Sequence, residues 1–176
     1  MSSTLALRQK LVAIARQNEG KTESSRNQAP WIKPLWGATS FPGGFVERQP
    51  YCAAGMAWSL REWLKLPEVL KALGLTPASA EEWRCKSASC FKDTKSWSAW
   101  AKKNKLTVLG KNDTFHTGDL IIFSFSHIEM YISDLPDGRY LAVGYNTDDA
   151  GSREGDGCFV KPRGREKIRE VIRMLA

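Results

Sequence analysis

The sequence predicts a single α+β domain in which N-terminal helices pack on a C-terminal antiparallel sheet of about five to six strands. Apolar residues recur at helical spacing before Asn104, and afterwards they alternate with polar residues. Helices followed by strands are typical of the α+β class. The length of 176 residues favours one domain spanning 1–176, because domains most often hold about 100–150 residues.

The helical half begins with apolar residues at Leu7, Leu11 and Ile14, and Gly20 follows as a stop signal. The stretch from Lys21 to Pro50 is rich in proline and glycine and has no clean period, so we expect a long irregular segment there. The expected helices are 4–18, 52–66, 67–73, 79–83 and 96–103.

The sheet half is rich in β-branched and aromatic residues, with turn residues between the apolar runs. The expected strands are 105–109, 119–125, 127–133, 139–146 and 157–162. The final stretch, 169–175, fits either a strand or a helix, and we favour a strand.

The charge of the chain favours anionic partners. Lysine and arginine outnumber aspartate and glutamate, which gives a net charge of +7. The densest basic run, Lys161 to Arg173, has no interleaved aromatic platform, so we do not expect nucleic-acid binding. No apolar run approaches the ~20 residues of a membrane span. The N-terminus does not read as a secretory signal, so we expect cytoplasmic synthesis and then delivery by phage lysis or a dedicated secretion machine.

The cysteines are too few for a disulfide scaffold in a chain of this size. Cys85 and Cys90 leave two alternatives open, a small disulfide loop or two free thiols. A second pair of closely spaced zinc ligands is missing, so we expect neither a metal nor an organic cofactor. Cys158 follows a glycine-rich turn and is expected in the core.

Cys52 opens the second helix, in the stretch "RQPYCAAGMAWSL". The exposed N–H groups and the dipole at a helix N-terminus favour a thiolate there. Taken alone, such a cysteine is more often a small buried residue. A nucleophile also needs a base, and the base needs an orienting partner.

His127 is the stronger candidate for the base. His116 stands in a turn-like stretch, whereas His127 opens a strand, where the sheet fixes its position. If the hairpin at "DLPDGRY" pairs Leu135 with Tyr140, Glu129 faces Asn146 on the next strand. That register puts several polar side chains on one face of the sheet, namely His127, Glu129, Asn146 and Asp148.

Small residues predict which face of the sheet the second helix covers. Ala142 and Gly144 share the face of His127, and the helix itself begins Ala53-Ala54-Gly55 after the cysteine. We therefore expect a close contact of helix and sheet on this face that brings thiol to imidazole.

The segments "PYCAAGMAWSL", "TGDLIIFSFSHIEMYIS" and "YLAVGYN", in this order, resemble the CHAP/NlpC-type, papain-like cysteine amidase and peptidase superfamily of bacterial and phage cell-wall hydrolases. The likeness extends to "ARQNEGKTESSRNQAPWI" and leaves Pro67 to Lys103 unmatched. It implies Cys52 as the nucleophile, His127 as the general base and acid, and Asn146 as the group that orients the imidazole.

The chain also departs from the family pattern. Glu129 stands where members commonly have glycine, so Glu129 and Asp148 are further candidates for orienting His127. The oxyanion hole would use the backbone N–H of Cys52 and a second donor, for which Gln49 and Tyr51 are both candidates.

The resemblance implies hydrolysis of amide bonds in peptidoglycan, through a thioester and without a cofactor. Two alternatives stay open: a non-catalytic module of the same fold that binds wall polymer or a protein, and a cysteine hydrolase of another amide. The sequence also leaves open which bond is cut and whether an inhibitor or immunity protein exists.

Overall fold

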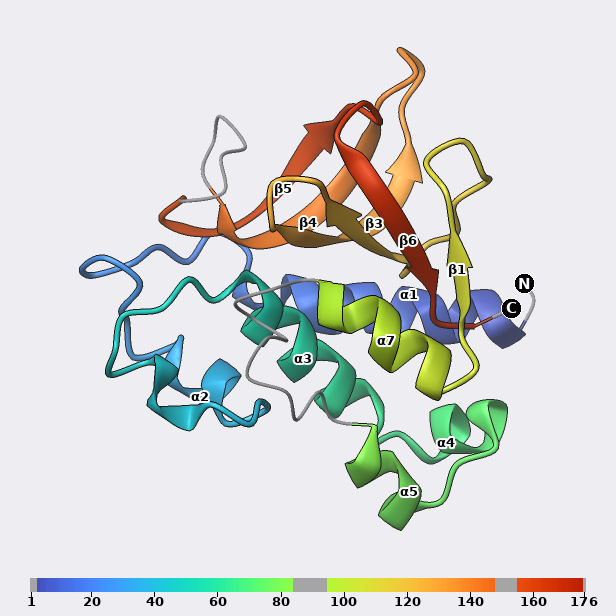
Figure 1. Ribbon diagram of the computed structural model, residues 1–176, viewed down its shortest axis with the longest axis horizontal. Helices are drawn as coiled ribbons and strands as arrows, with labels where there is room; N and C mark the ends of the chain where they lie inside the picture. Colours follow the sequence, from blue (N-terminus) through green and yellow to red (C-terminus); the bar gives the residue numbers. More distant parts are fainter. Residues whose placement is uncertain (1–2, 84–94, 148–154, 176) are drawn as a thin grey trace.

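The computed structural model describes residues 3–83, 95–147 and 155–175. In it, helices pack against a six-stranded antiparallel sheet (Figure 1). The helices are α1 (Ser3–Ala15), α2 (Lys33–Trp36), α3 (Cys52–Trp63), α4 (Pro67–Leu73), α5 (Pro77–Glu82) and α7 (Lys95–Lys103), with the 3-10 turns η1 (Arg16–Asn18) and η2 (Pro42–Gly44). The strands are β1 (Thr107–Leu109), β2 (Leu120–Phe123), β3 (Ile128–Asp134), β4 (Tyr140–Thr147), β5 (Gly157–Arg163) and β6 (Ile168–Arg173). The predicted α+β class and the size of the sheet are confirmed.

The strands lie in the order β1-β6-β2-β3-β4-β5, and every pairing is antiparallel. The final strand therefore enters the sheet between β1 and β2, which confirms the expectation of a strand near the C-terminus. β2, β3 and β4 are consecutive neighbours, and this meander carries the candidate histidine and its surroundings.

The helices α1, α3 and α7 lie along one face of the sheet (Figure 1). Alternation along the strands sends one set of apolar side chains into the core shared with the helices, among them Leu120, Ile122, Ile128, Met130, Val143, Tyr145 and Ile172. The other set forms a second, smaller cluster on the opposite face, with Ile121, Phe123, Tyr131, Tyr140, Ala142, Ile168 and Val171.

Helix α3 packs on the face of Tyr145, so the expectation that it covers Ala142 and Gly144 is wrong. A Cβ atom added at Gly55 would lie 2.2 Å from Cγ of Tyr145, which means that the ring sits directly on the helix backbone. The Tyr145 hydroxyl also donates a 2.8 Å hydrogen bond to the carbonyl of Ala15 in α1. The hydrophobic effect explains the choice, because Ile128, Met130, Val143 and Tyr145 of β3 and β4 face this side, whereas the other side of these strands carries the Glu129 carboxylate.

The hairpin between β3 and β4 differs from the expected pairing of Leu135 with Tyr140. Tyr140 pairs with Asp134, and Leu135 N–H donates to the Arg139 carbonyl at 2.8 Å. Gly138 in the loop has φ of 84°, a left-handed conformation that glycine adopts without strain. The loop is thus one residue shorter than expected.

A second irregularity, between Tyr131 and Ser133, moves the inner pairing by one more residue. Glu129 therefore pairs with Gly144 and not with Asn146. Two shifts of one residue restore the side-chain parity, so Glu129 and Gly144 do share a face. A Cβ at Gly144 would stand 2.6 Å from Glu129 Oε1, so the glycine makes room for the carboxylate.

Beyond the C-terminal end of α3, helices α4 and α5 lie away from the sheet (Figure 1). Both helices have a proline in the first turn, Pro67 in α4 and Pro77 in α5. Gly74 ends α4 with a φ of 67°. At the start of α5, the Thr76 side chain accepts a hydrogen bond from Ser79 N–H in a capping box. None of the described helices has the length and apolar character needed to cross a membrane.

Candidate active site

Cys52 is the first residue of α3, as the sequence predicted, and its side chain is 3% exposed. Tyr51 is the N-cap, and its side chain gives the helix no capping hydrogen bond. The backbone N–H groups of the first turn, next to the thiol, therefore receive no hydrogen bond from the side chain of the N-cap residue.

His127 lies immediately before β3 and is 1% exposed. Its carbonyl accepts a 2.9 Å hydrogen bond from Phe123 N–H, which closes the short turn between β2 and β3. The imidazole stacks on the Phe125 ring, with 5.9 Å between the ring centroids and 12° between the ring planes. Its centroid lies 5.8 Å from that of the Phe123 ring. Strand and aromatic packing together fix the ring.

Glu129, two residues further on β3, is the partner of the imidazole. Its Oε1 lies 3.1 Å from His127 Nε2, and the side chain is 0% exposed. Arg163 of β5 donates two hydrogen bonds to the same carboxylate, from Nε to Oε2 at 2.8 Å and from Nη2 to Oε1. Arg163 Nη2 also donates to Thr147 Oγ1 at 2.9 Å.

The electrostatics of this cluster favour a charged carboxylate. Burial raises the pKa of Glu129, but hydrogen bonds from Arg163 and His127 outweigh it and lower the pKa to about 2. Burial likewise lowers the pKa of His127, and hydrogen bonding to Cys52 and Glu129 more than offsets this and raises the pKa to about 9. Cys52, His127 and Glu129 thus form one interacting group, with Arg163 behind it.

The proton positions follow from these charges. Glu129 as a carboxylate only accepts hydrogen bonds, so Nε2 carries the hydrogen between the two side chains. In the neutral imidazole the lone pair is then on Nδ1, a buried atom with no hydrogen-bond partner of regular geometry among the described residues. Nδ1 is the nitrogen left to take a proton from the Cys52 thiol.

Asn146 is buried on β4, where the pairing with β5 is interrupted between Tyr145 and Thr147. Its φ of 54° is left-handed, which asparagine tolerates better than most residues. Nε2 of His127 donates its hydrogen bond to Glu129, one of the alternatives that the sequence left open. An orienting role for Asn146 stays a prediction, and Asp148, like Cys85 and Cys90, lies outside the described residues.

Tyr51 and Gln49 were the two candidates for the second oxyanion donor. The Tyr51 ring is fully buried and packs edge-on against Trp31 at 5.5 Å. Burial, followed by the charge and hydrogen bonding of Glu23, raises the pKa of Tyr51, so its hydroxyl keeps its proton. Gln49 and Tyr51 therefore both stay predicted donors.

A cavity of about 250 Å³ lies next to the histidine and its carboxylate. Phe123 and Phe125, which pack on the imidazole, form part of its lining, and Arg163 and Lys167 form another part. Cys52, His127 and Glu129 are not among its lining residues, and each of the three is at most 3% exposed. Among the described residues no three His, Cys, Asp or Glu side chains are grouped to hold a metal ion.

Arg163 is the residue of the site that the sequence reasoning missed, because it stands in a basic run that looked like a solvated face. A signal was present nonetheless. A glutamate placed on the interior of a sheet needs a cation, since an unpaired buried charge is strongly unfavourable. Arg163 pairs with Tyr140 in the β4–β5 ladder, a register that the sequence does not show.

Comparison with known proteins gives no further guide: no protein-family model, no curated protein and no solved structure matches this chain.

Proposed function

We propose that this chain is a papain-like cysteine hydrolase that cleaves amide bonds through a thioester. The observation that carries the proposal is the buried series of Cys52, His127 and Glu129, with its carboxylate held by Arg163. A cysteine at a helix N-terminus, a base that interacts with it and a group that orients the base are the three parts of nucleophilic acyl transfer.

The first half-reaction starts from the neutral form of His127, which is the minor form below its pKa of about 9. In it, Cys52 Sγ bonds to the amide carbonyl carbon while its proton passes to His127 Nδ1. The Nε2–H group stays hydrogen bonded to Glu129, which stabilises the imidazolium that forms. The imidazolium then gives the Nδ1 proton to the leaving amine, the C–N bond breaks, and a thioester remains.

In the second half-reaction, a water molecule gives a proton to His127 Nδ1 and attacks the thioester carbonyl. The C–S bond breaks, the carboxylic acid leaves, and the proton returns to Cys52. The backbone N–H of Cys52 and the side chain of either Gln49 or Tyr51 are the proposed donors to the oxyanion in both halves.

Peptidoglycan is the proposed substrate, cut at a bond within the stem peptide or at the sugar–peptide amide. Two features support it: the resemblance of the segments around Cys52, His127 and Asn146 to cell-wall hydrolases, and a net charge of +7 that suits an anionic wall. The proposed place of action is the cell wall or the periplasm.

Purified sacculi test this proposal. They are incubated with the native chain, with Cys52→Ala and with Cys158→Ala, and soluble fragments are identified by mass. Cys158 is a fully buried core cysteine on β5 and serves as the matched control. We expect new amino or carboxyl ends from the native chain and Cys158→Ala only, and equal products from Cys52→Ala would overturn the assignment.

The burial of Cys52 favours a second candidate, a module of the same fold that binds wall polymer without cutting it. This module would sediment with sacculi and release no fragments, and its binding would be the same in native chain and Cys52→Ala. A hydrolase of another amide would neither sediment with sacculi nor release fragments from them.

A further inference from the structure

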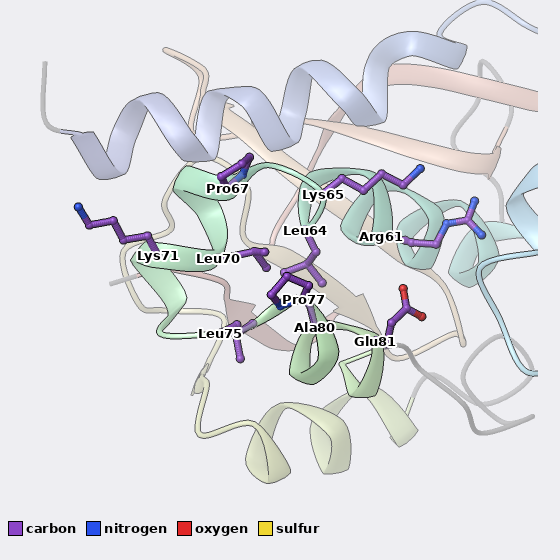
Figure 2. A pocket seen from close by; sticks show the side chains of 10 residues that line it. All are labelled: Arg61, Leu64, Lys65, Pro67, Leu70, Lys71, Leu75, Pro77, Ala80 and Glu81. Atoms are coloured by element: carbon purple, nitrogen blue, oxygen red, sulfur yellow. The ribbon is translucent and has the colours of Figure 1, made fainter.

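A cavity of about 600 Å³ lies at the C-terminal end of α3, between that helix, α4 and α5 (Figure 2). Its lining begins at Arg61, nine positions after Cys52 on the same helix, so the two are roughly 14 Å apart along the axis at 1.5 Å per residue. The cavity is therefore separate from the candidate active site.

Apolar side chains make up most of the wall. They come from α4, α5 and the segments that join α3, α4 and α5, and are Leu64, Pro67, Leu70, Leu75, Pro77 and Ala80. Proline in the first turn of both α4 and α5, with the capping box at Thr76, holds these elements in place without a ligand. A preformed apolar cavity of this volume is typical of a site for a small molecule.

The polar lining is positively charged on balance. Arg61, Lys65 and Lys71 contribute three cations against the single carboxylate of Glu81. Glu62 forms ion pairs with both Arg61 and Lys65, at 3.3 and 2.6 Å, so one carboxylate serves two cations. Lys71 forms no ion pair within the described part of the chain, and Figure 2 shows it at the edge of the cavity, with its ammonium group directed outward.

We propose that this cavity binds a small amphiphilic anion, with its apolar body against the leucine and proline wall and its one negative group at Lys71. Apolar walls exclude water and bind a hydrocarbon body, while the surplus positive charge selects an anionic head over a cationic or neutral one. Binding here does not depend on the chemistry proposed for Cys52.

Calorimetric titration of the full native chain with decanoate and with decyltrimethylammonium, both below their micelle concentrations, tests the proposal. The two probes share a ten-carbon body and differ in the sign of the head group. We expect 1:1 binding of decanoate at least tenfold tighter than that of decyltrimethylammonium, in the native chain and in Cys52→Ala alike. Equal affinity for the two probes, or binding only at micellar concentrations, would overturn the proposal.

Variants locate the site. Lys71→Glu, a change at an exposed side chain, is expected to remove the preference for decanoate, and Lys33→Glu on α2 is the matched control that keeps it. Leu70→Trp and Leu75→Trp fill the cavity and are expected to weaken decanoate binding at least tenfold, each checked for folding by circular dichroism. Native affinity in a folded tryptophan variant, or a preference unchanged by Lys71→Glu, would place the ligand elsewhere.

Discussion

Replacing Glu129 with glutamine keeps the shape of the side chain and removes its charge. Glu129 is 0% exposed and the Arg163 side chain 11%, so the change leaves a buried guanidinium without its carboxylate. Breaking one partner of a buried pair costs about 3–5 kcal/mol. We therefore expect Glu129→Gln to lower the free energy of unfolding by about that amount and the melting temperature by roughly 10 °C.

The same change alters the base. A glutamine amide offers Nε2 a donor as readily as an acceptor, so the hydrogen on the imidazole is free to move to Nδ1, where it blocks transfer from the thiol. The pKa of His127, raised to about 9 in the native chain, also falls because one of the interactions that raise it loses its charge. General acid–base catalysis contributes typically 10²–10⁴-fold, so we expect hydrolysis of sacculi to slow by about 100-fold or more.

A double variant separates the two effects. Glu129→Gln combined with Arg163→Met removes both charges of the buried pair, so urea unfolding is expected to recover most of the lost stability while hydrolysis stays slow. If Glu129→Gln hydrolyses sacculi within a few-fold of the native rate, Glu129 does not orient His127, and Asn146 or Asp148 takes that role. If unfolding is unchanged, the buried pair with Arg163 is not as described.

Three further predictions concern the support of the site. The raised pKa of His127 contributes stability that is fully present below the ordinary pKa of 6.5 and is lost as the pH rises through about 9. We expect urea unfolding at pH 6 and pH 9.5 to show a loss of about 3 kcal/mol in the free energy of unfolding. His127→Gln is expected to abolish this loss. Gly55→Ala places a methyl group against the Tyr145 ring and is expected to lower the free energy of unfolding by about 1–3 kcal/mol. In the control variant Gly43→Ala, the methyl group has no neighbour nearer than 3.7 Å, so we expect the urea midpoint to stay nearly unchanged. Tyr145→Phe removes the 2.8 Å bond to Ala15 and is expected to lower stability by about 1–2 kcal/mol, and an unchanged midpoint would mean that this contact is not formed in solution.

The order of helices and strands was predictable because the hydrophobic period changes along the chain. The period of 3.6 before Asn104 and the period of two afterwards are local properties, and the structure follows both. The position of Cys52 at the start of α3 was predictable for the same reason, since Pro50 and the apolar pattern that follows mark a helix start.

The register of β3 and β4 was not predictable from the residues alone. It depends on the hairpin loop and on an irregularity between Tyr131 and Ser133, and neither has a distinct local signal. The prediction of which side chains of β3 and β4 share a face was correct only because the two shifts add up to two residues. The face chosen by α3 was predicted wrongly, because small residues at Ala142 and Gly144 were taken as a helix contact when Gly144 makes room for Glu129.

The third partner of the site shows the same limit. Glu129 was a candidate because its face could be deduced from its spacing to His127, but Arg163 is 34 residues away and reaches it across two strand pairings. Long-range contacts of this kind follow from the sheet order, which a single sequence does not specify.

The proposed reaction passes through a thioester at Cys52, which rapid acid quench followed by mass spectrometry detects. Sacculi are mixed with the native chain and with Cys52→Ala, quenched within a turnover, and the peptide that contains position 52 is weighed. We expect an acyl adduct on the native peptide, matched in mass to the released wall fragment, and none on the variant. Release of the same fragments by Cys52→Ala at the native rate would contradict it.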